Sequence, residues 1–234
     1  LQMIDAIQRG AFDYFLHQTN DANGLVRDKT CPGWPASIAA VGLGLTAYAV
    51  GVERGFVTRR AAAERALSTL RFFWRSKQGP EPDAMGHKGF YYHFLDMQTG
   101  ARVSRCELST VDSALLLAGM LVSAAYFDRD TPTEREIRDL AERLYARVDW
   151  DWGRNGGVTI THGWKPESGF LPYRWEGYDE ALLLYVLALG SPTHPLPPES
   201  YQAWASTYQW KAIYGTEFLY AGPLFTHQLS HVWI

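Results

Sequence analysis

Apolar residues recur with α-helical spacing through most of the chain. The pattern predicts seven helices, at residues 2–17, 36–53, 58–76, 110–127, 133–149, 178–190 and 198–211. The first carries Ile4, Ile7, Ala11, Phe12 and Phe15 on one face. The turn-forming residues 21–24 follow it, and we expect them to end this element of structure.

Two kinds of helix alternate after the first. The segments that begin at residues 36, 110 and 178 are apolar on nearly every side, whereas their successors have a polar face. One predicted stripe is Ala63, Ala66, Leu67, Leu70 and Trp74, and the next is Ile137, Leu140, Ala141, Leu144, Tyr145 and Val148. An all-apolar helix must be covered on all sides, but an amphipathic one faces solvent. A buried and then a surface helix, repeated about every 65–75 residues, predicts an all-α toroid with inner and outer rings, because common helical solenoids have shorter periods.

Two long loops interrupt this pattern, at residues 77–109 and 150–177. Residues 90–103 contain two short runs around a glycine-containing turn and predict a β-hairpin, and residues 156–162 favour another short strand. The second loop is rich in aromatic residues: Trp150, Trp152, Trp164, Tyr173 and Trp175. Long loops on a rigid scaffold commonly carry function.

Composition narrows the function classes. The chain has 234 residues with 22 basic and 25 acidic side chains, a formal net charge of -3, which argues against a nucleic-acid partner. Aromatic residues make up 14%, with nine Trp. No apolar run is long enough for a membrane span, which needs about 18 residues. No leader peptide is visible, although the chain does not begin with Met and a removed export signal stays open.

The sequence contains no motif that implies a cofactor or a metal. Cys31 and Cys106 match no zinc spacing, and whether they pair depends on the fold. His227 and His231 are four residues apart and could share a helical face as metal ligands, but no third ligand lies near them in sequence. We interpret them as polar groups of a cleft or as interior histidines. The oligomeric state is left undetermined.

The carboxylates that open the inner helices are the main candidates for chemistry. In a toroid of helical hairpins the inner helices run the same way, so residues 27–34, 107–112 and 175–180 should meet at one rim. Each opening brings at least one carboxylate, and two bring a Trp. One carboxylic acid, one carboxylate and aromatic faces for sugar rings are the parts that glycosidic cleavage requires.

Helix capping is the competing explanation. Ser109 or Thr110 is a good N-cap, and acids in a first turn interact favourably with the helix dipole. The dipole also lowers a carboxyl pKa, whereas a general acid needs a raised one. Desolvation by Trp175, Tyr178 and the apolar run after Glu180 could supply the opposite effect.

Several of these segments resemble one bacterial family, the glucoamylase-like domains that include endo-β-1,2-glucanases. The matching stretches are 24–28, 37–42, 89–96, 107–112, 178–180, 187–192 and 222–228. The resemblance implies an (α/α)6 toroid in a single domain over residues 1–234. It also implies that this chain is the N-terminal part of the family domain, because seven predicted helices fall short of the twelve in a closed ring. Another chain could complete the ring instead, and a catalytic base in the remainder would leave this piece inactive.

The resemblance also implies residue roles. Glu180 matches an acidic residue at the start of an inner helix and is the candidate general acid, with Asp112 and Glu176 as further catalytic candidates. The expected substrate-binding residues are Arg27, Asp28, Trp34, Tyr92, Glu107, Trp164, Tyr173, Trp175, Tyr178 and His227. The expected substrate is a glucan, with β-1,2 linkages and inversion at the anomeric carbon suggested by the glucanase members. A periplasmic or extracellular location is expected with it.

Two other hypotheses stay open at this point. The chain could be a glycan-binding or accessory module without hydrolysis of its own, because aromatic residues can bind sugar unaided. It could also be a purely structural helical scaffold, in which the rim acids only cap helices.

Overall fold

A computed structural model describes residues 2–234. Seven helices lie where the apolar pattern predicts them: α1 Gln2–His17, α2 Ile38–Glu53, α3 Arg59–Arg75, α4 Thr110–Tyr126, α5 Pro132–Ala146, α7 Leu182–Leu189 and α8 Pro198–Ser206. The one-turn α6 Trp150–Gly153 and the 3-10 turns η1 Leu224–His227 and η2 Ser230–Val232 were not predicted. Two predicted boundaries were wrong. Helix α7 begins four residues late, after a turn, and α8 ends before residues that form a strand.

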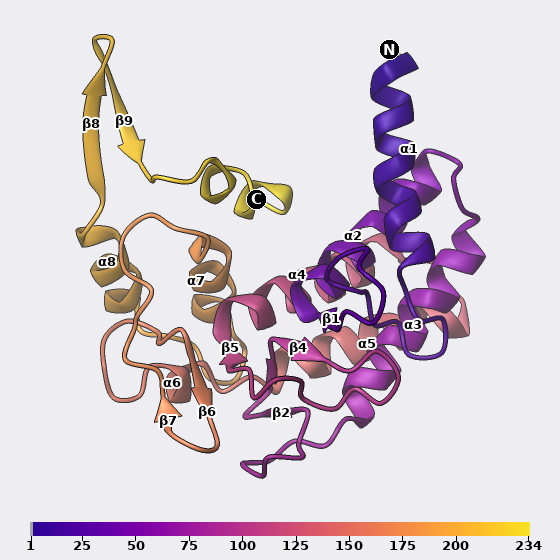
Figure 1. The fold of residues 1–234 in the computed structure, drawn as a ribbon, viewed down its shortest axis with the longest axis horizontal. Coiled ribbons are helices and arrows are strands. Elements are labelled where there is room, and N and C mark those ends of the chain that lie inside the picture. Colours follow the sequence, from indigo (N-terminus) through magenta and orange to yellow (C-terminus); the bar gives the residue numbers. More distant parts are fainter. Residues whose placement is uncertain (1) are drawn as a thin grey trace.

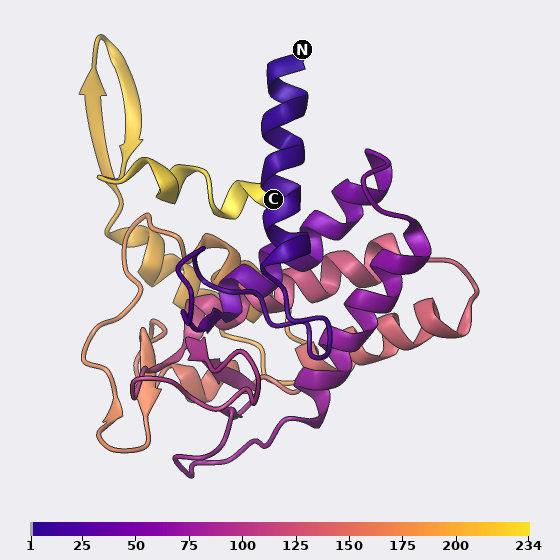
Figure 2. The same cartoon turned by 45° about the vertical axis from the view of Figure 1, so that its right-hand side comes forward.

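The helices form an inner and an outer layer (Figure 1, Figure 2). The inner helices α2, α4 and α7 contact one another in that order, and α3 packs against α5 behind them. Helix α8 packs against α7. This arrangement matches the predicted alternation of buried and amphipathic helices.

A close approach of α2 and α4 depends on glycine. A Cβ added to Gly42 would lie 2.2 Å from the carbonyl oxygen of Leu115, and one added to Gly119 would lie 2.1 Å from the carbonyl oxygen of Gly42. Either side chain would overlap the facing backbone. Gly42 and Gly119 therefore determine how closely the two inner helices α2 and α4 can approach each other.

The outer helices bury most of the predicted stripes. Residues Ala63, Ala66, Leu67 and Leu70 of α3 are buried, as are Ile137, Leu140, Ala141 and Leu144 of α5. Trp74 is an exception, because its side chain is 37% exposed and Phe73 fills the core in its place.

Short strands precede the inner helices. They are β1 Ala36–Ser37, β2 Gly86–His87, β3 Phe90–Tyr92, β4 Phe94–Leu95, β5 Leu108–Ser109, β6 Gly163–Lys165 and β7 Gly169–Phe170. One sheet has the order β2-β3-β5-β6-β7, and β1 pairs with β4 in a second. Strands β1 and β5 lead directly into α2 and α4, so the sheets position the starts of two inner helices.

The loop predictions were partly correct. Val103 N donates to Phe94 O and Asp96 N to Ala101 O, so a hairpin-like turn does surround Gly100. The earlier run, β3, instead pairs with β2 and β5. The strand expected at residues 156–162 lies just after them, as β6.

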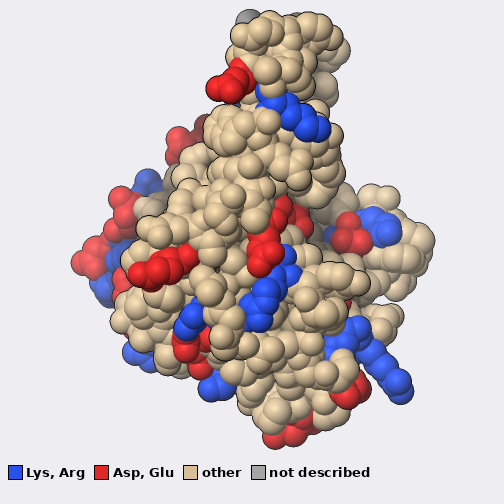
Figure 3. Space-filling model, turned by 90° about the vertical axis from the view of Figure 1, so that its left-hand side faces the viewer, with Lys and Arg blue, Asp and Glu red and all other residues tan. Residues whose placement is uncertain are grey.

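Two elements project from the layers (Figure 1). Only Phe12 of α1 is buried, while Ile4 and Ile7 are exposed, so the predicted apolar face of this helix is only partly used. The unpredicted hairpin β8 Gln209–Ile213 and β9 Thr216–Tyr220 extends from the other side. Figure 3 shows that side, with acidic and basic residues interspersed and a mostly uncharged projection.

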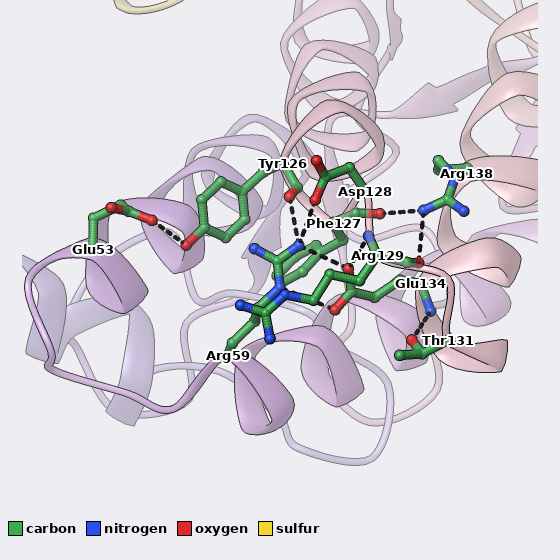
Figure 4. A network of polar contacts seen from close by, with 9 residues as sticks. All are labelled: Glu53, Arg59, Tyr126, Phe127, Asp128, Arg129, Thr131, Glu134 and Arg138. Carbon is green, nitrogen blue, oxygen red and sulfur yellow. Dashed lines mark hydrogen bonds and ion pairs between the residues drawn. The ribbon is translucent and has the colours of Figure 1, made fainter.

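A polar network joins the outer helices to the end of α4 (Figure 4). Arg59 at the start of α3 donates to both carboxylate oxygens of Glu134, at 3.0 and 2.7 Å, and to the carbonyl of Tyr126 at 2.8 Å. Arg138 donates to the carbonyl of Phe127. Cationic side chains thus satisfy carbonyl groups at the C-terminal end of α4, where the helix itself provides no donors.

Cys31 is exposed and Cys106 is buried, and both are free thiols. Among residues 2–234, no helix is both long and apolar enough to cross a membrane.

Candidate active site

Backbone hydrogen bonds draw the rim segments together. The amide of Ile38 at the start of α2 donates to His93 O at 3.2 Å, and His93 N donates to Glu107 O at 3.0 Å. The amide of Thr110 at the start of α4 donates to His162 O. The starts of α2 and α4 therefore meet on the strand segments, as the toroid geometry predicts.

His93 lies at the centre of the acidic groups. Its Nδ1 is 2.9 Å from Glu107 Oε1, and its Nε2 is 3.6 Å from Asp112 Oδ2. Burial lowers the pKa of His93, but the hydrogen bond with Glu107 and the charges of the surrounding carboxylates outweigh it and raise the pKa. The same hydrogen bond lowers the pKa of Glu107.

Asp112 lies in the first turn of α4. The N-cap Ser109 accepts from the amide of Asp112 at 3.3 Å, and its hydroxyl donates to Asp112 Oδ2 at 2.5 Å. Burial raises the pKa of Asp112, although the charge of His93 and the Ser109 hydrogen bond oppose that rise. The predicted capping is present, with Ser109 as the N-cap residue. Asp112 therefore takes part in the start of α4, and its carboxylate is also buried beside His93.

Glu180 lies in a turn before α7, not within the helix. Burial, followed by the charges of Asp112 and Asp179, raises the pKa of Glu180 to about 7. The sequence placed Glu180 in the first turn of a helix, where the dipole would lower its pKa. The first turn of α7 instead begins two residues later, at Leu182, so Glu180 lies outside that turn. The influence of Asp112 shows that these two carboxyl groups, distant in sequence, interact through space.

The Glu180 turn is held from two sides. Gly177 enters it with φ of +84°, a left-handed backbone conformation that glycine adopts readily. Asp179 Oδ1 accepts from the amide of Ala181 at 2.9 Å and from Trp204 Nε1 at 3.2 Å. Ser230 Oγ donates to Glu180 O at 3.3 Å, and Leu183 N donates to Ser230 Oγ at 3.4 Å.

The first opening segment borders the acidic cluster. Trp34 Nε1 donates to Asp28 Oδ2 at 3.1 Å, and Arg27 Nη1 donates to Trp34 O at 3.2 Å. The Trp34 side chain is 38% exposed, and the Lys29 ammonium lies 4.1 Å from the centre of its ring. The negative charge of Asp28 contributes to the raised pKa values of His93 and Asp112.

Tyr178 and Glu176 border a neighbouring pocket of about 460 Å³ that reaches the base of the β8–β9 hairpin. The ring of Tyr178 lies 5.1 Å from that of His227, and its hydroxyl is 3.3 Å from His231 Nε2. Glu176 is exposed and accepts from Thr159 Oγ1 at 3.0 Å. A larger hollow of about 770 Å³ lies along α3 and the start of α5, far from these acids.

The alternative in which the two histidines share a helical face is not met, because they lie in separate 3-10 turns, His227 in η1 and His231 in η2. Residues 2–234 contain no group of three or more His, Cys, Asp or Glu side chains arranged to hold a metal ion.

Four aromatic candidates are not part of the acidic cluster. Tyr92 is fully buried beneath the guanidinium of Arg102, and Trp175 is buried, with its ring stacked on His162 and its Nε1 bonded to Thr110 Oγ1. Trp164 is half-buried among aromatic rings, and Tyr173 is 67% exposed. Tyr92 and Trp175 are too buried to contact a ligand directly in this structure. Their rings belong to the core, which is the other common use of aromatic residues in loops.

Sequence reasoning missed His93 and Asp179. His93 was visible as the polar residue in the run Phe90–Leu95, where the other side chains are apolar or aromatic. Its partners could not be seen, because they depend on how the strand pairs. Asp179 was not among the candidate site residues, and its Oδ1 accepts from both the amide of Ala181 and the indole of Trp204.

Comparison with known proteins agrees with this geometry. Residues 172–234 match the family model described as "Putative glucoamylase". The chain is 27% identical over 228 residues to the exo β-1,2-glucooligosaccharide sophorohydrolase (non-reducing end) of Parabacteroides distasonis. The resemblance expected from the sequence is confirmed.

Solved structures support the fold. A glucoamylase-like protein of Bacteroides uniformis superposes with a TM-score of 0.87 at 29% identity, over 97% of this chain and 57% of that one. A β-1,2-glucanase of Parabacteroides distasonis superposes with a TM-score of 0.79 at 25% identity, over 89% of this chain and 30% of that one. The predicted all-α toroidal fold class is therefore confirmed.

The match is long in this chain but partial in its relatives. The chain is covered to 93% in the sophorohydrolase comparison, yet it spans 30% of that protein.

Proposed function

We propose that this chain carries the acid site of a glycoside hydrolase that cleaves β-1,2-linked glucan. Glu180 acts as the general acid, and Asp112 acts as the base that activates water, with inversion at the anomeric carbon. The observation that supports this most directly is the raised pKa of Glu180, about 7, beside a second buried carboxyl group.

The chemistry requires two carboxyl groups in different protonation states. The acid must hold a proton near neutral pH to protonate the leaving oxygen, whereas the base must be ionised. Glu180 meets the first requirement because burial and neighbouring negative charges disfavour its ionisation. Burial raises the pKa of Asp112, and two contacts oppose that rise by favouring its charged form: the neighbouring His93 and the hydrogen bond from Ser109.

The substrate class rests on the relatives and on the rim. Two of the similar proteins are named for action on β-1,2-linked glucose chains. The exposed face of Trp34 offers an apolar surface for a sugar ring, and Asp28 and Arg27 beside it offer hydrogen-bonding groups for hydroxyls. Tyr178, His227 and Glu176 provide a second set around the neighbouring pocket.

The direct test is incubation of the chain with linear β-1,2-glucan, followed by chromatographic separation of the products. Shortened oligosaccharides should form, and Glu180→Gln should abolish them. Glu199→Gln, at an exposed acid on α8, is the matched control and should leave activity unchanged. Binding of glucan by the wild type without product would refute hydrolysis and support a binding module.

Product stereochemistry tests the role of Asp112. Proton NMR during early turnover should show the α-anomer formed first from a β-linked chain. Initial formation of the β-anomer would contradict inversion and require a covalent intermediate.

We also propose a periplasmic or extracellular location, where a glucan polymer would be accessible. Fractionation of the producing cell with an antibody against the chain tests this. Recovery with cytoplasmic markers would refute it.

A further inference from the structure

The imidazole of His93 lies between two carboxylates, that of Glu107 just before strand β5 and that of Asp112 in the first turn of α4. Nδ1 is 2.9 Å from Glu107 Oε1, and Nε2 is 3.6 Å from Asp112 Oδ2. A neutral imidazole has one N–H and can donate to only one of them, whereas an imidazolium presents an N–H to both. The arrangement therefore favours the charged ring.

The ring position is fixed independently of these carboxylates. The backbone of His93 donates to Glu107 O and accepts from Ile38 N. The imidazole also stacks on the ring of Phe94, with centroids 3.9 Å apart and an angle of 13° between the planes. The rest of the fold thus holds the ring in place, so Asp112 and Glu107 are positioned against a preformed partner.

The electrostatic surroundings are strongly acidic. The charges of Asp28, Glu107 and Asp112 raise the pKa of His93, and the positive charge of His93 acts to lower the pKa of Glu180. Two lysines also act on these acids: the charge of Lys165 lowers the pKa of Glu107, and Lys29 Nζ lies 3.9 Å from Asp28 Oδ2. The imidazolium of His93 thus interacts with four carboxyl groups, those of Asp28, Glu107, Asp112 and Glu180. The closer a carboxyl group lies to the ring, the more strongly the positive charge favours the ionised form of that group.

We propose that His93 is a positioning residue that, as an imidazolium, holds Asp112 ionised and thereby leaves the proton on Glu180. The catalytic part of this inference rests on the proposed function, whereas the charged state of His93 does not. His93 makes no contact with the reacting bond in this role. It acts through the carboxylate of Asp112.

The assignment follows from the asymmetry of the contacts. The charge of Asp112 raises the pKa of Glu180 by like-charge repulsion, so an ionised Asp112 favours a protonated Glu180. His93 and Ser109 both contact Asp112 Oδ2, whereas the Glu180 carboxyl feels His93 only through space. Burial raises the pKa of both groups, but only Asp112 has two direct contacts that oppose the rise. On this asymmetry we assign the proton to Glu180, which gives the two groups the different states that acid and base catalysis need.

The charge state can be tested without substrate. Nitrogen-15 NMR of the histidine rings should show His93 titrating above the ordinary value of about 6.5. Asp112→Asn should lower that midpoint, while His194→Asn, at an exposed histidine, identifies its own signal and leaves His93 unchanged. A His93 ring that is neutral at pH 6, or a midpoint unaffected by Asp112→Asn, would overturn the proposal even if the protein hydrolyses glucan.

The catalytic role needs a pH profile. His93→Asn removes the positive charge, so the pKa values of Asp112 and Glu180 should both rise and both limbs of the kcat/KM profile should move to higher pH. A shift of one unit lowers the rate below the acid limb about tenfold. His93→Lys keeps a positive charge and should restore the limbs toward their wild-type positions, and His194→Asn is the control.

The alternatives give different results. If His93→Asn and His93→Lys lose the same fraction of kcat/KM at every pH, and the limbs of the pH profile do not move, His93 has a purely structural role and the positioning role is overturned. If the wild type has no activity at all, the proposed hydrolysis fails, and the NMR titration alone decides whether His93 holds the charge.

Discussion

Trp233 Nε1 donates a hydrogen bond of 2.9 Å to Thr46 Oγ1, which joins the C-terminal segment to the first inner helix. Leu229 and Trp233 also pack against Leu115 and Leu183, which belong to the other two inner helices. Ser230 of the same segment contacts the Glu180 turn. The C-terminal segment therefore lies across all three inner helices and supports the candidate acid.

Replacing Trp233 should loosen this support. Trp233→Phe removes the donor to Thr46 and should lower the free energy of unfolding by about 1 kcal/mol, the usual net value of such a bond. Urea denaturation followed by circular dichroism measures it. Trp210→Phe, at an exposed hairpin residue, is the control. Equal stability of Trp233→Phe and wild type would mean that the indole bond contributes nothing.

Gly42→Ala should separate α2 from α4. The added Cβ would meet Leu115 O at 2.2 Å, so the helices must shift, at a cost of about 1–3 kcal/mol. Gly10→Ala on α1 is the matched control, because its Cβ meets nothing within 4 Å and alanine favours a helix by about 1 kcal/mol. Thermal unfolding should move the two variants in opposite directions. A stabilised Gly42→Ala protein would show that the approach is looser than the structure indicates.

Arg59→Ala should destabilise the fold far more than Arg60→Ala. Arg59 pairs with Glu134, whose side chain is 6% exposed, so its removal leaves a buried carboxylate without its cation and should cost about 3 kcal/mol. Arg60 pairs with Glu64 at an exposed site, and its loss should leave the unfolding midpoint unchanged within error. Guanidinium denaturation at pH 7 compares them, and similar midpoints would contradict the network in Figure 4.

Glu180→Gln should make the protein more stable than wild type at high pH. The folded-state pKa of Glu180 is raised to about 7, so the native state holds a proton that the unfolded chain releases from its ordinary pKa upward. The contribution of Glu180 to the free energy of unfolding is therefore most favourable below the unfolded-state pKa of about 4.3, and it is lost as the pH rises through the folded-state pKa. Unfolding free energies at pH 5 and pH 8.5 should show the Gln variant gaining mainly at pH 8.5. A difference that is the same at both pH values would argue against a raised pKa.

Trp34→Ala should weaken glucan binding without unfolding the protein. The exposed indole provides the apolar face for a sugar ring, and packing of a ring on such a side chain contributes on the order of 1 kcal/mol. Isothermal titration with a β-1,2-linked oligosaccharide should show a severalfold higher Kd, with Trp74→Ala as the control at a similarly exposed indole of α3. Unchanged affinity would remove Trp34 from the binding surface. Trp175→Ala is unsuitable here, because its buried ring stacks on His162.

The helical architecture could be predicted from the amino-acid sequence alone. Apolar periodicity located seven of the eight α-helices in residues 2–234 and missed only the one-turn α6, and the contrast between all-apolar and amphipathic segments distinguished inner from outer layers. These features are local, because a helix buries its apolar side wherever it packs. Strand pairing was less predictable: β3 and β4 are adjacent in sequence but join different sheets, since pairing depends on distant partners.

The acidic rim shows the same division at the level of single residues. The sequence pointed to Glu180 and Asp112, because carboxylates that open inner helices must converge in a toroid. Only the tertiary structure decided that His93 lies between Glu107 and Asp112, that burial raises the pKa of Glu180, and that Trp175 and Tyr92 lie in the interior. Protonation and burial depend on neighbours that the chain brings together from distant positions, so no local pattern could determine them.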